Sequence, residues 1–328
     1  MPASSDPIRV GVLGAAKITP SALIQPAQSV EGVEVFGVAA RDPLRARRFA
    51  AEYGLVRAFD SYENLLADPQ VDAVYVPLPA TLHAEWVIAA IEAGKHVLCE
   101  KPFASNSTDA ARVAEVAERS GVIVMEAYHS AYHPLQDQLR AILDTEVLGH
   151  VSAARAVFCI PLLSRKAIQW NPALGGGGLL DVGYYPVRQL RDLFGEPTHV
   201  IDARARQSRG VDRRFDAAMQ FPGGVRGEIV TAIMSRRLLA SRLEIRGAAG
   251  SLRVTWPYHP QSGARLLLRT AGRTHVVPIE RRSSYLYQLE AFRDAVRTRT
   301  EPRTGAREAV AQMSAIDRLY EAAGMRPR

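Results

Sequence analysis

Three side chains of the sequence have the types and the spacing that proton transfer at an oxygen atom requires. Lys101 follows a short apolar segment and precedes a proline, whereas Asp181 and Tyr185 follow a run of glycines, 175–178. Asp181 and Tyr185 would share one face of a helix, because positions i and i+4 are neighbours there. A tyrosine hydroxyl can act as a general acid or base, and a nearby ammonium lowers its pKa. The glycines would let the backbone approach a bound molecule closely. Each residue alone also has a structural explanation, as a surface lysine, a helix cap and a core tyrosine.

A glycine turn follows the first expected strand, residues 8–13. The segment Gly14-Ala-Ala-Lys-Ile-Thr19 keeps the spacing of the dinucleotide fingerprint Gly-x-Gly-x-x-Gly, with Ala16 and Thr19 at the second and third glycine positions. Gly14 suits the tight turn, and Ala16 is small enough for a pyrophosphate to approach the start of the next helix. A plain strand-to-helix turn is the alternative, but the position at the first such junction favours a nucleotide site.

The end of the second expected strand, 33–40, indicates which nucleotide would bind. Sites that prefer NAD place an acidic residue there to bind the ribose 2′-hydroxyl. This sequence instead reads Ala39-Ala40-Arg41-Asp42. A guanidinium at this point can pair with a 2′-phosphate and lie over the adenine. Arg41 therefore favours NADP over NAD, and the alternative is a solvated arginine beside a helix-capping Asp42.

The elements that would position these residues alternate between strands and helices over the first third of the chain. Apolar runs predict strands at 8–13, 33–40, 73–76, 95–99 and 122–125. Capped and amphipathic segments predict helices at 21–29, 43–53, 61–67, 80–93 and 107–119. This alternation predicts an α/β fold that begins with a Rossmann-type, doubly wound parallel sheet.

The pattern changes near residue 150. Closely spaced segments predict strands at 151–160, 198–207, 214–221, 225–234, 241–246, 251–255 and 264–270, and helices at 183–193, 284–297 and 304–323. Few helices between many strands are typical of an α+β domain with a large, mostly antiparallel sheet. We expect an NADP-binding Rossmann domain over 1–127 and a substrate and oligomerisation domain over 128–328, whose last helix can pack back onto the Rossmann domain. One large α/β domain is the alternative.

Composition excludes several classes of protein. The chain of 328 residues is 47% hydrophobic and 23% charged, which is ordinary for a globular protein. No apolar run approaches the ~20 residues that span a bilayer, and the first residues lack the features of a signal peptide. The net charge of +7 comes from scattered arginines, so we expect no nucleic-acid partner. Cys99 and Cys159 have no CxxC partner, so neither a metal site nor a disulfide framework is expected, and we expect a cytoplasmic protein.

Two segments together resemble one known family. Residues 94–102 (GKHVLCEKP) and 175–185 (GGGGLLDVGYY) are similar to the Glu-Lys-Pro and Gly-Gly-Gly-x-x-x-Asp-x-Gly-x-(His or Tyr) motifs of the glucose–fructose oxidoreductase / inositol dehydrogenase (Gfo/Idh/MocA) family. The resemblance continues through 125–134 and the C-terminal helices, so it spans the chain. The tyrosine is similar to the dihydrodiol dehydrogenase and xylose dehydrogenase branch, although Ala131 stands where that branch often has arginine.

The resemblance implies roles for individual residues. Lys101, Asp181 and Tyr185 would be catalytic, and the Lys101–Pro102 bond would be cis. Residues that contact the cofactor would be Gly14, Ala16, Lys17, Ile18, Arg41, Pro77, Leu78, His83, Glu100 and Lys101. Residues that contact the substrate would be His133, Lys166 and Trp170. His83 and the three substrate residues also have structural explanations, as a buried ring, a helix cap, a loop residue and a packing residue.

These features predict an NADP-dependent oxidoreductase that acts on CH–OH groups. It would transfer a hydride between the nicotinamide and a carbonyl or hydroxyl of a sugar, a nucleotide-linked ketosugar or a cyclic polyol. We expect a small-molecule substrate, no metal, no membrane partner, and a homodimer or homotetramer assembled through the C-terminal sheet. Two alternatives stay open: an NADP-binding sensor without turnover, and an NAD-dependent glycoside hydrolase of the same family.

Overall fold

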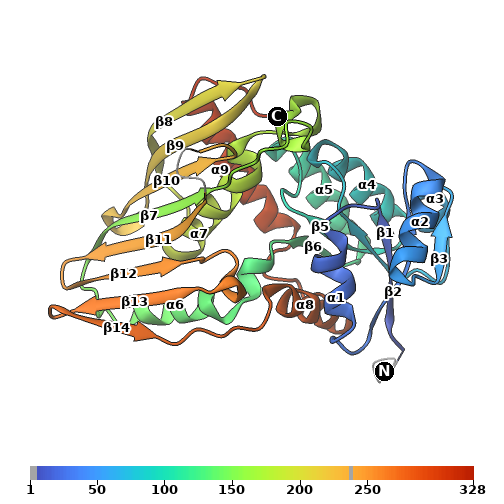
Figure 1. The fold of residues 1–328 in the computed structure, drawn as a ribbon, viewed down its shortest axis with the longest axis horizontal. Coiled ribbons are helices and arrows are strands. Elements are labelled where there is room, and N and C mark those ends of the chain that lie inside the picture. Colours follow the sequence, from blue (N-terminus) through green and yellow to red (C-terminus); the bar gives the residue numbers. More distant parts are fainter. Residues whose placement is uncertain (1–5, 236–238) are drawn as a thin grey trace. The chain divides into compact units, whose positions relative to one another are not determined.

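The chain forms two compact units, each built from two separate stretches of sequence. The computed structural model describes residues 6–235 and 239–328. The first unit comprises Met1–Tyr132 and Tyr285–Val310, and the second comprises His133–Ser284 and Ala311–Arg328. Figure 1 shows the ribbon coloured along the sequence. A segment that follows most of the second unit in the sequence therefore completes the first.

A parallel sheet forms the centre of the first unit. In the described residues its strands are β1 (Ile8–Leu13), β2 (Val33–Ala39), β3 (Arg57–Phe59), β4 (Ala73–Val76), β5 (His96–Glu100) and β6 (Val124–Ala127). Their order is β3-β2-β1-β4-β5-β6, and every pairing is parallel. The order reverses between β1 and β4, and such a reversal is where doubly wound sheets bind ligands, outside the carboxyl ends of the strands. The predicted Rossmann-type sheet is confirmed.

Helices of the first unit begin and end where capping residues place them. They are α1 (Gln25–Ala27), which continues a π-helical turn (Pro20–Ile24), α2 (Pro43–Tyr53), α3 (Tyr62–Leu66), α4 (Ala80–Glu92), α5 (Ser107–Ser120) and most of α8 (Ser284–Thr298). The Asp42 carboxylate accepts a hydrogen bond from the backbone N–H of Leu44 at 3.0 Å and caps α2. Gly54 ends α2 with φ +67°, a conformation that glycine adopts without strain. Ser61 caps α3 in the same manner as Asp42.

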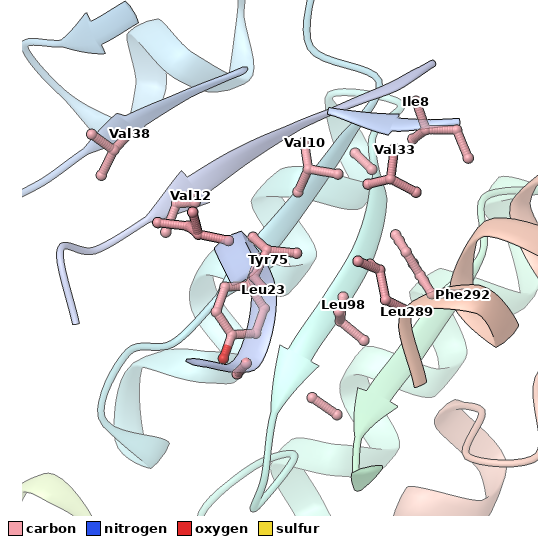
Figure 2. Close-up of a cluster of buried hydrophobic side chains, with 14 of the residues drawn as sticks. Ile8, Val10, Val12, Leu23, Val33, Val38, Tyr75, Leu98, Leu289 and Phe292 are labelled. Carbon is pink, nitrogen blue, oxygen red and sulfur yellow. The ribbon is translucent and has the colours of Figure 1, made fainter. Parts of the chain in front are cut away.

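The core of the first unit joins the sheet to α8. Val10 and Val12 of β1 and Leu98 of β5 are fully buried. Leu289 and Phe292 of α8 belong to the same cluster, as Figure 2 shows. Each such buried side chain stabilises the fold by roughly 1.5–3 kcal/mol. This packing fixes α8 to a sheet that ends more than a hundred and fifty residues earlier in the chain.

The second unit contains a large mixed sheet. Its strands in the described residues are β7 (Val151–Cys159), β8 (His199–Ser208), β9 (Val211–Gln220), β10 (Arg226–Ala232), β11 (Ala240–Gly247), β12 (Gly250–Thr255), β13 (Arg265–Thr270) and β14 (Arg273–Val277), in the order β14-β13-β12-β11-β7-β10-β9-β8. Only the β7–β10 pairing is parallel among those described. The predicted large, mostly antiparallel sheet is confirmed.

One face of this sheet packs against helices. They are α6 (Pro134–Asp144), α7 (Tyr184–Phe194) and, from residue 311, α9 (Ala306–Ala322). Phe158 of β7 contacts the ring of Tyr185 in α7. Since side chains alternate along a strand, Val157 and Cys159 point to the opposite face. That opposite face is called the open face below.

The structure differs from the predicted elements in several segments, and α6 (Pro134–Asp144) was not among the predicted helices. β3 and β14 were not predicted, because runs of three and five residues give little periodicity to detect. β9 begins at Val211 rather than at the predicted 214, because Asp212 and Arg213 interrupt the alternation of polar and apolar residues.

Candidate active site

Lys101 lies directly after β5, at the carboxyl end of the first sheet. β5 ends at Glu100, and the Lys101–Pro102 peptide bond is cis, as the family resemblance implied. The Lys101 side chain is partly exposed. Its ammonium therefore belongs to the edge of the sheet where ligands of doubly wound folds bind.

Two carboxylates hold the turn that carries Lys101. The backbone N–H of Phe103 donates to Oε1 of Glu126 at 2.9 Å, and Glu126 is fully buried. The Tyr75 hydroxyl donates to Oε1 of Glu100 at 2.6 Å, and Oε2 of Glu100 accepts from the N–H of Lys101 at 3.2 Å. Burial, reinforced by the Glu100 carboxylate, holds the pKa of the Tyr75 hydroxyl well above its usual range. Glu126 was not singled out from the sequence, although a glutamate inside an apolar strand was a signal.

His83 connects the loops that follow β4 and β5. Its Nδ1 lies 2.8 Å from the carbonyl oxygen of Pro102, and its Nε2 lies 2.7 Å from that of Leu78. Burial lowers the pKa of the ring, and the charge of Lys101 acts in the same direction. The predicted cofactor residues Pro77 and Leu78 are thus tied to the Lys101 turn through this histidine.

Gly14 opens the turn that was predicted to bind a pyrophosphate. Its φ angle is +112°, a value that residues other than glycine rarely adopt. No side chain caps the helical turn Pro20–Ile24 that follows. Thr19 Oγ1 is buried there without a hydrogen-bond partner among the described residues. The turn that Gly14 opens also holds the predicted cofactor residues Ala16, Lys17 and Ile18, of which the last two are exposed.

Two arginines flank the end of β2. Arg41 is exposed directly after Ala40, as expected from the sequence. Arg45, one helical turn later, donates from Nη2 to the carbonyl oxygen of Ala15 in the glycine turn, at 2.5 Å. The hydroxyl of Tyr62 lies against the backbone of Arg41. Burial raises the pKa of this hydroxyl, and the charges of Arg41 and Arg45 oppose that rise. Sequence reasoning missed Arg45, whose four-residue spacing from Arg41 was the available signal.

These residues fit NADP better than NAD. The position after β2 offers an exposed guanidinium, and the adjoining Asp42 carboxylate is engaged as the cap of α2. Two guanidinium groups near a glycine turn can form charge-assisted bonds to a 2′-phosphate.

Asp181 and Tyr185 lie on one continuous helical segment of the second unit. Asp181 is in a π-helical turn (Leu179–Gly183), which runs directly into α7. Such turns are frequent at functional sites. Asp181 is partly exposed, whereas Tyr185 is 5% exposed. Asp181 and Tyr185 therefore share one helical segment of the second unit, whereas Lys101 belongs to the first unit.

Three aromatic rings pack against Tyr185. Its ring centroid lies 5.4 Å from Phe158, 5.6 Å from Tyr258 and 5.9 Å from His259. Tyr258 and His259 come from the loop between β12 and β13, where no periodic pattern marks them in the sequence. Packing against these three rings restricts the orientation of the Tyr185 ring.

Internal packing explains the glycines before Asp181. A Cβ on Gly176 would lie 2.7 Å from the carbonyl oxygens of Asn171 and Gln169. A Cβ on Gly177 would lie 2.4 Å from the carboxylate of Asp212. The expected reason was close approach to a bound molecule, but the space beside these glycines is filled by the protein itself.

The three predicted substrate residues have different environments. His133 caps α6, because its Nδ1 accepts from the N–H of Leu135 at 3.1 Å, and burial lowers its pKa. Lys166 is exposed in a loop. Trp170 is 9% exposed, and its Nε1 has no hydrogen-bond partner in the described part of the chain.

Two kinds of feature are absent from residues 6–235 and 239–328. No group of His, Cys, Asp or Glu side chains there could hold a metal ion. No helix there is long and apolar enough to cross a membrane.

Comparison with known proteins gives matches over nearly the whole chain. Residues 8–128 match the family described as "Oxidoreductase family, NAD-binding Rossmann fold", and residues 137–253 match the GFO/IDH/MocA C-terminal domain. D-xylose 1-dehydrogenase (NADP⁺) 2 of Haloferax volcanii is 35% identical over 95% of this chain and 96% of its own. Trans-1,2-dihydrobenzene-1,2-diol dehydrogenase of Mus musculus is 35% identical over 67% of this chain and 66% of its own.

A solved structure is similar over the same length. The crystal structure of a 3-ketoreductase from Actinomadura kijaniata, in complex with NADP and TDP-benzene, has a TM-score of 0.89 and 30% identity, covering 97% of this chain and 98% of that one. The predicted enzyme class, NADP cofactor and branch are confirmed by these matches. The chain is an NADP-dependent oxidoreductase and belongs to the Gfo/Idh/MocA family.

Proposed function

We propose that the chain transfers a hydride between NADP and a carbonyl or hydroxyl carbon of a sugar, a nucleotide-linked ketosugar or a cyclic polyol, with Lys101, Asp181 and Tyr185 as its reacting side chains. The observation that supports the proposal is that Asp181 and Tyr185 lie four residues apart on one helical segment of the second unit, a spacing that puts two residues on the same side of a helix. Lys101, at the carboxyl end of β5, supplies the cation of the set.

Each side chain has a distinct role in this proposal. NADPH, when bound, supplies the hydride to the carbonyl carbon. Tyr185 donates its hydroxyl proton to the carbonyl oxygen, and it regains a proton from solvent, so the product is an alcohol. The Lys101 ammonium hydrogen-bonds the substrate oxygen and lowers the pKa of the tyrosine. Asp181 accepts a hydrogen bond from a substrate hydroxyl or from the lysine. The reverse sequence oxidises an alcohol.

Trp170 supports a substrate rich in oxygen atoms. Its indole N–H is buried without an acceptor among the described residues, and leaving such a donor unsatisfied costs about 1–3 kcal/mol. A substrate hydroxyl or phosphate oxygen would satisfy it. We keep His133 and Lys166 as further substrate contacts of the proposal, although His133 reaches a substrate only if it releases its cap on α6.

A panel of substrates tests this function. NADPH oxidation should be measured with ketosugars and nucleotide-linked ketosugars, and NADP⁺ reduction with aldoses and cyclic polyols. Turnover of at least one of these classes is the expected result. NADP binding without turnover of any class would favour the sensor, and hydrolysis of a glycoside with no net change in cofactor would favour the glycoside hydrolase.

Residues 1–127 are proposed to bind NADP, and residues 128–328 are proposed to bind the substrate and to mediate assembly. The chain is proposed to work in the cytoplasm, where the buried thiols of Cys99 and Cys159 would stay reduced.

The open face of the second sheet is the proposed surface for assembly. An apolar cluster of Val157, Cys159, Val230 and Ala232 belongs to this face, but its side chains are only 0–6% exposed in the single chain. Charged side chains are exposed on the face, for example Arg226, which pairs with Glu228 at 3.2 Å. Interfaces between identical chains are self-complementary, so arginine and glutamate side chains of one face can pair with those of its copy. The predicted homodimer or homotetramer would join two such faces.

Light scattering at micromolar protein should therefore give a mass of at least two chains. Arg226→Glu places a second negative charge beside Glu228 on the exposed part of this face and should lower the mass to one chain. Leu44→Glu, which adds a negative charge at an exposed site of α2, should leave the mass unchanged. A monomer mass for the wild type would remove this proposal.

A further inference from the structure

A β-bulge turns Asp212 away from the open face and into the second unit. In the β8–β9 pairing Arg206 opposes Arg214 and Gln207 opposes Asp212, so Arg213 is an extra residue in β9. Without it, alternation would place Asp212 on the same face as Arg214. Bulges commonly re-aim a side chain in this way. The result is a carboxylate that is 0% exposed.

Asp212 holds the start of the helical segment that carries Asp181 and Tyr185. Its Oδ2 accepts from the backbone N–H of Leu179 at 2.6 Å. Leu179 is the first residue of the π-helical turn, and the residue before it provides no side-chain cap. The first N–H groups of a helix need acceptors from outside the helix. Asp212, in strand β9, therefore provides the hydrogen-bond acceptor that an N-cap side chain provides at the start of other helices.

The second carboxylate oxygen of Asp212 is held as well. Its Oδ1 accepts from the hydroxyl of Tyr320 in α9 at 3.1 Å. The guanidinium of Arg328 lies over the Tyr320 ring, and its Nη2 is 3.6 Å from the same Oδ1. Burial raises the pKa of Asp212, and the bonds from Leu179 and Tyr320 oppose that rise. The carboxylate is thus fixed from two sides.

The glycine run rests on the same carboxylate. A Cβ on Gly177 would lie 2.4 Å from Oδ1 of Asp212 and 3.0 Å from the Tyr320 hydroxyl. A Cβ on Gly178 would lie 2.9 Å from the backbone oxygen of Asp212. The glycines, the bulge and the carboxylate therefore form one packing arrangement beneath the helix start.

We propose that Asp212 is a positioning residue, which sets the place of Asp181 and Tyr185 by anchoring Leu179 under the glycine run. This inference rests on the proposed function of Asp181 and Tyr185. A misplacement of reacting groups by about 1 Å can lower a rate by as much as 10²-fold. Loss of the anchor should therefore lower kcat without weakening NADP binding, since the proposed cofactor residues all lie in the first unit.

Asp212→Ala and Asp212→Asn together test the anchor. Alanine removes the acceptor for the Leu179 N–H, so we expect kcat to fall about tenfold. Asparagine keeps an acceptor oxygen for Leu179, and its NH₂ can donate to the Tyr320 hydroxyl, which accepts as well as donates, so most of the loss should be recovered. Gly177→Ala presses on the same carboxylate from the other side and should also lower kcat.

The control is Asp68→Ala in the first unit. Asp68 is likewise buried and accepts a backbone N–H, from Gln70 at 2.7 Å, but it lies at the amino end of the sheet strands. This variant should lose thermal stability while keeping the wild-type kcat. It separates a general effect of losing a buried carboxylate from an effect on the helix.

Hydrogen exchange of the Leu179 amide and turnover should be measured on the same preparations, with Tyr185→Phe included. Faster exchange together with a lower kcat in Asp212→Ala, both largely restored in Asp212→Asn, is the expected result. A folded Asp212→Ala protein with wild-type kcat, or a folded Asp212→Asn protein as slow as Asp212→Ala, would overturn the inference. Wild-type turnover by Tyr185→Phe would instead contradict the proposed function, and the exchange data would still report on the anchor.

Discussion

Tyr185→Phe and Lys101→Met should each lower turnover by about 10²–10⁴-fold, the usual contribution of a general acid–base group. Phenylalanine keeps the ring that packs against Phe158, Tyr258 and His259 and loses only the hydroxyl. Methionine keeps most of the length of lysine and loses its charge. Steady-state rates, NADP titration and thermal melts on the same preparations measure the effect.

A second lysine provides the control. Lys95 lies just before β5, at the opposite end of that strand, and its ammonium donates to the carbonyl oxygens of Asp68 and Val71 at 2.9 and 2.7 Å. Lys95→Met should lower the melting temperature and leave kcat unchanged. If Lys101→Met behaved like Lys95→Met, the assignment of Lys101 would be wrong.

Arg41→Ala should weaken NADP binding more than tenfold and leave NAD binding nearly unchanged, because a desolvated charge-assisted bond contributes about 1.5–3 kcal/mol. Arg45 bonds to Ala15 in the glycine turn, and its charge acts on the same Tyr62 hydroxyl as that of Arg41. Arg41→Ala/Arg45→Ala should therefore weaken NADP binding roughly 100-fold, if both groups reach the 2′-phosphate. Fluorescence titration with each cofactor measures both variants.

Arg48→Ala is the matched control for this pair. Arg48 lies on α2, as Arg45 does. Its side chain is 78% exposed, and its Nη2 lies 3.9 Å from the Asp42 carboxylate. Its removal should change the affinity for neither cofactor. Equal losses for NADP and NAD in Arg41→Ala would show that Arg41 serves the structure of the loop alone. Equal losses in Arg45→Ala would show that Arg45 only braces the glycine turn.

Local chemistry made much of the fold predictable. Asp42, Gly54 and Ser61 act on their own neighbours, so the limits of α2 and the start of α3 could be inferred from single residues. The strand alternation of the second half likewise indicated the large sheet. Features that depend on distant partners were not accessible. The packing of Leu289 and Phe292 into the first sheet is a contact across the length of the chain.

For the candidate site as well, some residues could be predicted from the sequence and others could not. Lys101, Asp181 and Tyr185 stand in motifs whose residue types and spacing predict their chemistry, and the roles of these three side chains stay predictions. Asp212 carries no such signal, because period-two alternation assigns it to the open face and only the extra residue in β9 reverses that. The purpose of the glycine run could not be inferred either, since the group that fills the space beside Gly177 comes from another strand.

Transfer of deuterium from labelled NADPH tests the central claim most directly. The protein should be incubated with NADPH that carries deuterium at the transferable position and with the ketosugar that turns over fastest in the panel. The account predicts one deuterium on the carbon of the new alcohol, transferred stoichiometrically with cofactor oxidation and slowed strongly in Tyr185→Phe. A product without deuterium, or cofactor that stays reduced while the substrate changes, would contradict it.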